Sequence, residues 1–554
     1  MTVILSAQQA AIDPTISCWV GASAGTGKTK VLVDRLARLL LEGYPPEKLL
    51  CITFTKAAAT EMQHRLFKKL QDWAVCDLNL LKEDLTNLLG LVPSPVVLKR
   101  AQALFFTTLD TPGGLKIQTI HSFCQALLQR FPLEAGLDPS FELITEETAA
   151  QMIFEAQQKV FSSLTPSLEQ WLDFLTGEIS DTRFEDMLQS LHHQRGQFYY
   201  FLNCYPDLDR YRHTLEQFLN KGDNTLSGLS DSLLQDIAKT LEQHGSPADQ
   251  KMGITLQQAL KNNKDYSDLL LTKEGTIRQR LASPQFKDKF PELYYHLQQA
   301  ALYQESRHQH LKNKRIIDLS LAFVHIAKAI FDTYQNDKSQ RGLLDFEDLI
   351  ATTNYLLQQP EISDWIFYKL EGGFEHILID EAQDTSPAQW QVMQQMLTLL
   401  LIPDSPHRTL FIVGDIKQSI YSFQGAKPLL FASLQPYFQQ QLEIQNRPWR
   451  SINLHLSFRT TAAILTLVDH VFNNNPQGVQ FYESIQHLSH RDQEPGLVEI
   501  WPLIEASEVE VPCQVDDFWP LPLEQKDILS PGAQLAHQIA EKIQALLASD
   551  EVLP

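Results

Sequence analysis

The chain carries the segment Ala22-Ser23-Ala24-Gly25-Thr26-Gly27-Lys28-Thr29 between a β-rich apolar run and a segment of helical character. This segment fits the P-loop pattern, with Ala in its permissive first position. Gly25 and Gly27 allow backbone N–H groups to turn toward a phosphate, and the start of the helix adds positive potential. We expect Lys28 to reach β- and γ-phosphate oxygens and Thr29 to ligate Mg²⁺. A chance Gly/Ser/Thr turn is the alternative, and the strand and helix on either side disfavour it.

Five short apolar runs end in polar, glycine- or threonine-bearing turns, a pattern typical of buried parallel strands. They are Cys18 to Val20, Leu49 to Phe54, Lys116 to Ile120, His376 to Ile379 and Leu410 to Val413. Helical segments follow the first two runs, at Lys28 to Leu41 and at Lys56 to Trp73. This alternation predicts the α/β class with a doubly wound parallel sheet, in which ligands bind beyond the carboxyl ends of the strands.

Two adjacent carboxylates, Asp380 and Glu381, follow the fourth run, as a Walker B strand requires. We expect Asp380 near a metal ion and Glu381 near an attacking water. Because Mg²⁺ prefers oxygen ligands and keeps several waters, Asp380, Thr29 and the phosphates would be sufficient to hold it. An apolar run ending in Asp-Glu is common, and without the P-loop a simple acidic strand end would be the better interpretation.

From about Thr145 to Gln340 the chain changes to long Gln-, Leu-, Lys- and Glu-rich segments with little strand pattern. This texture predicts a large helical insertion, with Thr145 as an N-cap ahead of acidic residues in the first turn. Within it, Ser227 to Asn263 is polar and broken by Gly and Pro, so we expect loops there. Near the end of the chain, Ser530 to Ser549 has the pattern of an amphipathic helix.

The composition, 44% hydrophobic and 20% charged over 554 residues, is that of a soluble protein of several domains. Lys and Arg number 46 against 67 Asp and Glu, a net charge of −21. That balance argues against a protein that coats nucleic acid with its whole surface, so any nucleic-acid site should be a local groove. The six cysteines form no C-x-x-C pair, which favours free thiols in a reducing compartment. No apolar stretch is long enough to span a membrane, and we expect a cytoplasmic location.

Six further segments resemble the motifs of the UvrD-like superfamily-1 DNA helicases, in the order of that family. They are Thr53-Phe54-Thr55-Lys56-Ala57-Ala58-Ala59 (motif Ia), Thr119-Ile120-His121-Ser122-Phe123-Cys124 (motif Ib), Asp345-Phe346-Glu347-Asp348-Leu349, Asp380-Glu381-Ala382-Gln383-Asp384-Thr385 (the DEXQD motif), Val413-Gly414-Asp415-Ile416-Lys417-Gln418-Ser419-Ile420-Tyr421 (motif III) and Ser457-Phe458-Arg459-Thr460 (motif IV). Within the family, the form of the P-loop and of motif III and the large insertion look most like the AddA helicase-nuclease proteins. The resemblance implies a RecA-like fold.

For the ATP site, the resemblance implies that Gln9 reads adenine, with Gln8 one step away as the alternative, and that Phe458 stacks on the base. Gln418 would contact the γ-phosphate and the catalytic water. Arg459 would approach the γ-phosphate from the second RecA-like domain, where an arginine can supply about 10³ to 10⁵ in rate. The catalytic set expected on this basis is Lys28, Glu381, Gln418 and Arg459.

For DNA, the resemblance implies a single-strand groove lined by Phe54, His121, Tyr421 and Phe423. Base stacking on aromatic side chains is worth about 1–3 kcal/mol per base and tolerates any sequence, as a translocase needs. Hydrogen bonds to phosphates are expected from Thr53, Thr55 and Ser122. For Phe54 and Phe423, core packing after a strand is a nearly equal alternative. Gln424 stands where many relatives carry Arg, so one cationic contact is absent.

The resemblance also suggests a domain division. Residues 1–140 and 341–445 would form the first RecA-like domain, 141–340 the helical insertion, and 446–554 the start of a second RecA-like domain. Two motifs expected in that second domain, one Gly-x-Lys-Gly-Leu-Glu-like and one Ala-Leu-Thr-Arg-Ala-like with a second arginine finger, are not found, and neither is a carboxylate-rich nuclease signature. We therefore expect an amino-terminal fragment of a longer protein.

The function implied by the resemblance is an ATP- and Mg²⁺-dependent DNA helicase or translocase of 3′ to 5′ polarity, acting in double-strand-break repair and recombination. Its partners would be single-stranded and duplex-end DNA and an AddB-like protein, with no membrane. The alternative is a non-catalytic module that binds ATP or DNA ends within a repair complex. A P-loop kinase or transporter ATPase is disfavoured by the DNA-facing motifs.

Overall fold

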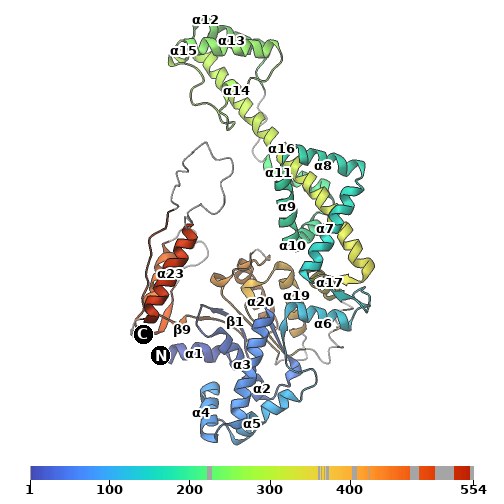
Figure 1. Cartoon of the computed structure of the whole chain (residues 1–554), viewed down its shortest axis with the longest axis vertical. Coiled ribbons are helices and arrows are strands. Elements are labelled where there is room, and N and C mark those ends of the chain that lie inside the picture. Colours follow the sequence, from blue (N-terminus) through green and yellow to red (C-terminus); the bar gives the residue numbers. More distant parts are fainter. Residues whose placement is uncertain are drawn as a thin grey trace, which may run out of the picture. The chain divides into compact units, whose positions relative to one another are not determined.

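A computed structural model describes the fold. The described residues are 2–220, 228–359, 362, 365–366, 369, 374–401, 408–422, 425–474, 486–505 and 530–548. They separate into two compact units, one drawn from 1–135, 350–422 and 426–554, the other mainly from 136–349. Figure 1 shows the elements of both. No helix among the described residues combines the length and the apolar character needed to cross a membrane.

The first unit is built on a six-stranded parallel sheet with the strand order β3-β2-β6-β7-β1-β8. Its strands are β1 (Ser17–Ala22), β2 (Leu49–Thr53), β3 (Lys116–Thr119), β6 (His376–Ile379), β7 (Thr409–Gly414) and β8 (Trp449–Leu454). Every residue of β2, β6 and β7 is buried, as expected for strands covered on both faces. The five predicted strands and the doubly wound α/β class are confirmed, and β8 is a sixth strand.

Helices follow the strands and cover the sheet. Those of the first unit are α1 (Thr2–Ala11), α2 (Lys28–Glu42), α3 (Lys56–Val75), α4 (Leu78–Leu89), α5 (Pro95–Leu109), α6 (Ile120–Arg130), α19 (Pro387–Leu400), α20 (Pro428–Ile444), α21 (Ala462–Asn473) and α23 (Pro531–Ala548), while α17 (Phe346–Gln358) begins at the end of the other unit. The two predicted helices after β1 and β2 are confirmed as α2 and α3, and the predicted carboxyl-terminal helix as α23.

The two faces of the sheet have different cores, because successive side chains of a strand point to opposite faces. Cys18 and Val20 of β1 join the leucines of α2 in one aliphatic cluster. Trp19, between them, is 2% exposed and packs against the rings of Phe431, at 4.7 Å between centroids, and Trp390, at 6.1 Å. Alternate side chains of β1 thus pack into the cores on both faces of the sheet, directly before the P-loop.

A buried arginine on α2 fixes the segment between α1 and β1. Arg35 is 0% exposed, and its guanidinium donates to the carbonyl oxygens of Ala11 (2.7 Å), Asp13 (2.8 Å) and Ile16 (2.7 Å) and to Thr409 Oγ1 (3.2 Å). A charge without such partners would be very costly to bury. The arrangement places the end of α1 against α2, and so sets where the glutamines of α1 lie.

The second unit is helical. Its helices are α7 (Glu146–Ser162), α8 (Pro166–Glu178), α9 (Asp181–His193), α10 (Arg195–Cys204), α11 (Leu208–Leu219), α12 (Asp231–His244), α13 (Pro247–Lys261), α14 (Ser267–Leu270), α15 (Pro284–Lys289) and α16 (Pro291–Arg341); a short pair, β4 (Glu142–Leu143) and β5 (Leu343–Leu344), lies at its base. Thr145 caps α7 as predicted, since its side chain accepts from Thr148 N–H. The predicted helical insertion is confirmed.

A single helix of 51 residues, α16, runs through the whole of the second unit (Figure 1). Its first half packs in an apolar core with α12, α14 and α15, and its second half in another core with α7 to α10. Because the apolar side chains of α16 contribute to both cores, this one helix connects the two groups of helices.

The segment Ser227 to Asn263, where loops were expected, is mainly helical in its described part: α12 and α13 fill most of it, and Gly245 and Ser246 form a short loop between them. Pro247 occupies the first turn of α13, where its missing N–H costs nothing, and Ser246 with Asp249 forms a capping box. Gly253 lies within α13 at a close helix contact, where a Cβ would come within 2.5 Å of Ala238 O. These Gly and Pro residues start and pack helices, whereas in the sequence they look like helix breakers.

Beyond β8, strand β9 (Leu456–Thr461) pairs in parallel with β10 (Leu488–Arg491), and α21 packs on both. Because β8 pairs with β1, the large sheet extends past residue 445, to Leu454. The four-part domain division otherwise stays a prediction.

Candidate nucleotide site and nucleic-acid surface

The P-loop lies between β1 and α2 and needs glycine at two positions. Gly25 and Gly27 have φ values of +76° and +87°, in the region that side-chain-bearing residues rarely adopt. Thr26 closes the loop, since its backbone N–H and its hydroxyl both donate to Ser23 O, at 3.3 and 2.7 Å. Backbone N–H groups are thereby presented at the start of α2, the geometry of an anion site.

The lysine of the P-loop contacts residues that are more than 350 positions away in the sequence. Lys28 Nζ donates to both carboxylate oxygens of Glu381, at 3.2 and 3.0 Å, and to Gln418 Oε1 at 3.2 Å. The lysine side chain is 11% exposed and that of Glu381 32%, so the pair is only partly desolvated. Three of the four residues expected to act in catalysis therefore meet at one point.

Asp380 is the residue directly after β6, and it is 7% exposed. Its backbone N–H donates to Ile52 O at 2.9 Å, and its Oδ1 accepts from Glu381 N–H at 2.9 Å. Burial, reinforced by the Glu381 carboxylate and opposed by Lys28, raises the pKa of Asp380 to about 7. A buried carboxylate whose charge is so poorly compensated suits a bound cation, and Thr29 lies in the first turn of α2 beside Lys28.

A ring of hydrogen bonds joins the Walker B residues to motif III. Gln383 Nε2 donates to Glu381 Oε2 at 2.7 Å, while Gln383 Oε1 accepts from Asp415 N–H at 2.8 Å. Asp415 Oδ2 accepts from Gln418 Nε2 at 2.7 Å, and Gln418 returns to Lys28. Glu381 itself has φ +48°, a strained value for a residue with a side chain, which the surrounding ring holds in place.

Neighbouring glutamines on α1 face different parts of the first unit. Gln8 Nε2 donates to Thr26 O of the P-loop at 3.1 Å, and a Cβ on Gly27 would lie 3.4 Å from it. Gln9 is exposed, and its Nε2 lies 3.5 Å from Asn87 O of α4. The structure thus places Gln8, the alternative, on the P-loop and places Gln9 away from it.

Motif IV lies directly against the P-loop. Phe458 N–H donates to Gly25 O at 2.8 Å, and a Cβ on Gly25 would come within 2.6 Å of Ser457 Oγ and 2.7 Å of Arg459 Cβ. Gly25 is therefore required by this close approach as well as by its φ value. Phe458 is 41% exposed with its ring 5.0 Å from that of His490, and the buried Ser457 Oγ has no hydrogen-bond partner among the described residues. A buried polar atom of this kind beside the loop is compatible with a ligand.

Two of the aromatic residues expected on DNA meet at the carboxyl edge of the sheet. The rings of Phe54, after β2, and Tyr421, after β7, lie 4.7 Å apart at 44°. Both side chains are half-buried, so each retains an accessible part. Phe423 lies outside the described residues.

The remaining residues expected on DNA lie at the end of β2 and at the starts of α3 and α6. Thr53 is 1% exposed and donates to Thr55 O at 3.0 Å, whereas Thr55 caps α3 by accepting from Ala58 N–H. His121 and Ser122 lie in the first turn of α6, next to β3. Since Thr53 pairs with Thr119 across β2 and β3, motifs Ia and Ib are adjacent in the sheet.

The family-like segment Asp345 to Leu349 lies in a buried charged cluster of the second unit. Lys338 Nζ donates to Asp345 Oδ2 at 2.9 Å and to Asp348 Oδ2 at 2.5 Å, and Tyr334 OH donates to Asp345 Oδ2 at 2.7 Å. Arg195 Nε lies 3.4 Å from the same oxygen. Burial would raise the pKa of Asp345, but Lys338 and Arg195 outweigh it and hold that pKa below its usual range. This cluster binds the motif to α16 and α10.

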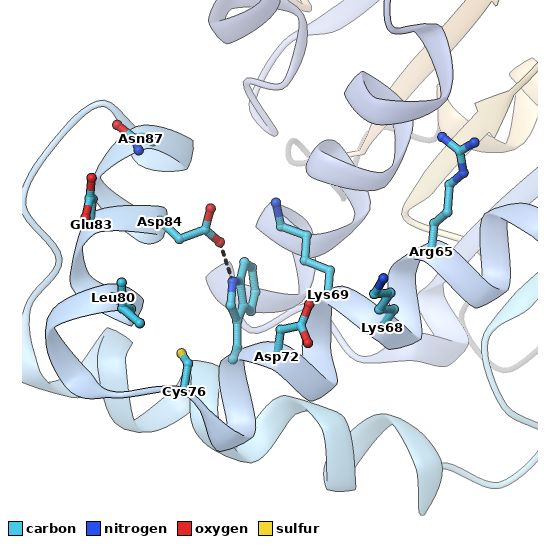
Figure 2. Close-up of a pocket in the computed structure, with 10 residues that line it drawn as sticks. Arg65, Lys68, Lys69, Asp72, Cys76, Leu80, Glu83, Asp84 and Asn87 are labelled. Atoms are coloured by element: carbon cyan, nitrogen blue, oxygen red, sulfur yellow. Dashed lines mark hydrogen bonds between the residues drawn. The ribbon is translucent and has the colours of Figure 1, made fainter. Parts of the chain in front are cut away.

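A separate cavity of about 580 Å³ lies between α3 and α4 (Figure 2). Trp73 is one of its lining residues and donates to Asp84 Oδ2 at 2.5 Å. Its charged lining residues are Arg65, Lys68, Lys69, Asp72, Glu83 and Asp84. Basic and acidic side chains are equal in number here, so the cavity lacks the single sign of charge that an anion or cation site needs.

Several residues of the site carried no assigned role in the sequence. Gln383, Asp415 and Lys417 lie within recognised motifs, and only their motif membership marked them. His487 lies outside every motif, and no sequence signal pointed to it. Its ring is 3.5 Å from Lys417 Nζ, which in turn donates to Ser23 of the P-loop.

Comparison with known proteins agrees with this geometry. The family described as UvrD/REP helicase N-terminal domain matches residues 5–439. Curated relatives named as ATP-dependent helicase/nuclease subunits include those of Enterococcus faecalis (27% identical over 84% of this chain and 38% of the relative), Listeria monocytogenes (26%, 82% and 38%) and Lactobacillus helveticus (28%, 82% and 39%). The chain thus spans about two fifths of the length of these relatives. Since the family match covers well over half of the chain and includes both Walker segments, the chain belongs to the UvrD/REP helicase N-terminal domain family.

Proposed function

We propose that this chain is the ATP-hydrolysing motor part of a DNA helicase or translocase that acts in double-strand-break repair. The observation that carries the proposal is the meeting of Lys28, Glu381 and Gln418 at one point, at distances of 3.0 to 3.2 Å. Two motifs far away in the sequence, the Walker B segment and motif III, converge there on the P-loop. The names of the curated relatives, which include both helicase and nuclease, support the same class of activity.

In this proposal Lys28 exchanges Glu381 and Gln418 for the β- and γ-phosphates when ATP binds. Glu381 is then released to accept a proton from the attacking water, and Gln418 turns its amide toward that water and the γ-phosphate. Arg459 places its positively charged guanidinium next to the γ-phosphate. Phosphoryl transfer depends mainly on such positioning and charge stabilisation, so the ring through Gln383 and Asp415 matters because it holds both acting groups.

Asp380 and Thr29 would hold Mg²⁺, together with the phosphates and water. Family members use ATP with Mg²⁺, and the buried, poorly compensated carboxylate of Asp380 fits a cation. The ion would neutralise charge on the phosphates. The chain's own contribution is to keep Asp380 fixed through two backbone hydrogen bonds at the end of β6.

Adenine recognition is assigned in this proposal to Gln8, which lies on the P-loop, in preference to Gln9, with Phe458 stacking on the base. A cavity of about 180 Å³, lined in part by Gln8 and Thr26, lies next to residues Asn453 to Leu456. A carboxamide can both donate to and accept from the edge of adenine, which makes it selective for that base.

Single-stranded DNA would stack on Phe54 and Tyr421, with Thr55, His121 and Ser122 near its phosphates. Thr53 is buried and its hydroxyl is already used, so we assign it a structural part in this groove. Gln418 and Tyr421 belong to one short segment after β7. Tyr421 follows Gln418 by three residues, so a displacement of Gln418 by the γ-phosphate would also move the ring on which DNA stacks. This would couple ATP hydrolysis directly to movement along DNA.

The finer parts of the proposal rest on the resemblance of the motifs to those of the family. They are 3′ to 5′ polarity, action on duplex ends, a cytoplasmic setting and an AddB-like partner protein. The free thiols of Cys18, Cys51, Cys76, Cys124 and Cys204 agree with a reducing compartment.

ATP turnover with and without single-stranded DNA tests the proposal. We expect DNA to stimulate hydrolysis in the natural chain, Lys28→Ala to lose nucleotide binding, and Glu381→Gln to bind ATP but lose at least about 100-fold in turnover, since it removes the proton acceptor. Binding without turnover in the natural chain would favour the non-catalytic module instead. Binding that survives Lys28→Ala would contradict the P-loop site itself.

A further inference from the structure

A second lysine, Lys417 in motif III, contacts the P-loop. Its Nζ donates to Ser23 Oγ at 2.8 Å. Ser23 is 7% exposed, whereas the lysine side chain is 27% exposed. The loop that follows β7 is thus tied directly to the phosphate-binding loop by a charged donor, and bonds of this kind are about twice as strong as neutral ones.

Ser23 is a sensitive point of the P-loop. Its carbonyl accepts both hydrogen bonds from Thr26, and its own N–H donates to Leu454 O at 3.4 Å, at the end of β8. Any shift of Ser23 would move Thr26 and the turn that leads into Lys28. The hydroxyl that Lys417 holds therefore belongs to the residue that shapes the first half of the loop.

An ion pair with the neighbouring carboxylate, Asp415, does not explain the position of the Lys417 ammonium group. Asp415 Oδ1 accepts from the backbone N–H of Lys417 at 3.1 Å, and its Oδ2 accepts from Gln418 Nε2 at 2.7 Å. Lys417 Nζ lies 4.0 Å from Asp415. Asp415 is satisfied without the ammonium, whose closer partners are Ser23 and a histidine.

That histidine, His487, is held in one orientation by Asp469 of α21. The ring Nδ1 lies 2.5 Å from Asp469 Oδ1, and the backbone N–H of His487 donates to Asp469 Oδ2 at 2.9 Å. In the neutral tautomer whose Nδ1–H donates to the carboxylate, Nε2 is an acceptor, and it lies 3.5 Å from Lys417 Nζ. The side chain of His487 is 8% exposed, so the ring has little freedom to turn.

We infer that Lys417 is a positioning residue of the P-loop and that the Asp469–His487 pair orients it. The inference rests on the proposed function of the P-loop as an ATP site. His487 directly precedes β10 and Asp469 lies on α21, both beyond the six-stranded sheet. The chain of contacts makes nucleotide affinity depend on where β10 and α21 lie, so these two elements act on the phosphate loop through Lys417 and Ser23 and not through a contact of their own with the nucleotide.

Equilibrium binding of a fluorescent adenine nucleotide to the whole chain provides the first test. We expect Lys417→Met to weaken binding about tenfold, the effect of one charge-assisted hydrogen bond, and Lys417→Arg to restore most of it. Lys427→Met removes the same charge from an exposed side chain nearby and should bind like the natural chain. Equal affinity of Lys417→Met and Lys427→Met would overturn the inference.

Two isosteric changes at His487 separate orientation of Lys417 from simple packing. Gln keeps an acceptor close to the position of Nε2, whereas Asn keeps a donor close to Nδ1 for Asp469. We expect His487→Gln to bind nucleotide almost normally and His487→Asn to resemble Lys417→Met. If the His487–Asp469 contact were merely structural, Asn would be the harmless change, and that result would contradict the inference.

A double-mutant cycle with Ser23→Ala completes the test. If Lys417 acts through Ser23, Lys417→Met should cost little further affinity once the hydroxyl is gone, whereas independent effects would add and would refute the inference. Lys28→Ala distinguishes this failure from failure of the ATP site. If Lys28→Ala does not change nucleotide binding, the proposed ATP site itself is contradicted. If Lys28→Ala abolishes binding but Lys417→Met leaves it unchanged, only the positioning role of Lys417 is contradicted.

Discussion

At the scale of single residues, the nucleotide site contains more buried carboxylate charge than its lysine neutralises. Lys28 neutralises Glu381, but Asp380, one residue earlier, is buried without a cation of its own among the described residues. Its pKa of about 7 lies far above the ordinary 3.8. The folded chain therefore binds this proton more tightly than the unfolded chain, and the resulting stability is fully present below pH 3.8 and lost as the pH rises through about 7.

Asp380→Asn should remove that pH dependence. The amide keeps the Oδ1 acceptor for Glu381 N–H but cannot ionise. Without metal or nucleotide, we expect the variant to exceed the natural chain in free energy of unfolding at pH 8 by up to about 4 kcal/mol, since one pKa unit corresponds to about 1.4 kcal/mol. Denaturant unfolding at several pH values measures the difference, which should vanish near pH 4. A difference in free energy of unfolding that stays constant across this pH range would contradict the raised pKa. The Asp380→Asn variant should also lose Mg²⁺-dependent ATP turnover.

The two glutamines of α1 give a matched pair for base recognition. We expect Gln8→Ala to reduce the preference for ATP over GTP by about tenfold, because the side chain on the P-loop side is lost, and Gln9→Ala to leave it unchanged. Competition binding with the two nucleotides measures the preference. The reverse result would show that α1 turns by one residue when the nucleotide binds.

At the scale of elements, the buried cluster around Asp345 holds α16, α10 and the start of α17 together. Lys338 and Asp345 are 0% and 1% exposed. Tyr334 OH donates a hydrogen bond to Asp345, and Arg195 Nε lies 3.4 Å from the same carboxylate as an ion pair. A fully paired cluster of this kind gives a specific arrangement, but it leaves a very costly unpaired charge when one member is removed.

Lys338→Met should therefore lower the free energy of unfolding of the second unit by about 3–5 kcal/mol, because Asp345 and Asp348 lose their shared cation. Lys328→Met is the control on the same helix, since Lys328 pairs with Asp332 at the surface, where such pairs are worth about 0.3–0.5 kcal/mol. Chemical denaturation followed by far-ultraviolet circular dichroism compares them. Equal effects would mean that the cluster is solvated in solution.

At the scale of the whole molecule, the two compact units have separate cores, so they need not unfold together. We expect two transitions in differential scanning calorimetry. Trp19→Ala, which opens the aromatic core behind β1, should lower one transition, with a loss of about 3–5 kcal/mol. Lys338→Met should lower the other. A single transition lowered by both substitutions would show that the units unfold as one.

The amino-acid pattern alone was enough for the P-loop, the Walker B carboxylates, the five strands and the helical insertion. Each depends on local properties: apolar runs of strand length, turn residues at fixed offsets and helical periodicity. It was not enough for Ser227 to Asn263, where Pro247 and Gly253 looked like breaks. Whether a glycine breaks a helix or lets two helices approach depends on what packs against it, and that is a tertiary contact.

The roles of other residues emerged only when distant segments met in the folded chain. Adjacent helical residues point about 100° apart, so the choice between Gln8 and Gln9 depends on how α1 is anchored, which the buried Arg35 decides. The ring through Gln383 and Asp415 and the contacts of Lys417 with Ser23 and His487 join segments tens to hundreds of residues apart. Local patterns specify elements because backbone geometry is local, whereas the pairing of side chains across a sheet edge depends on strand order and register, which only the folded chain sets.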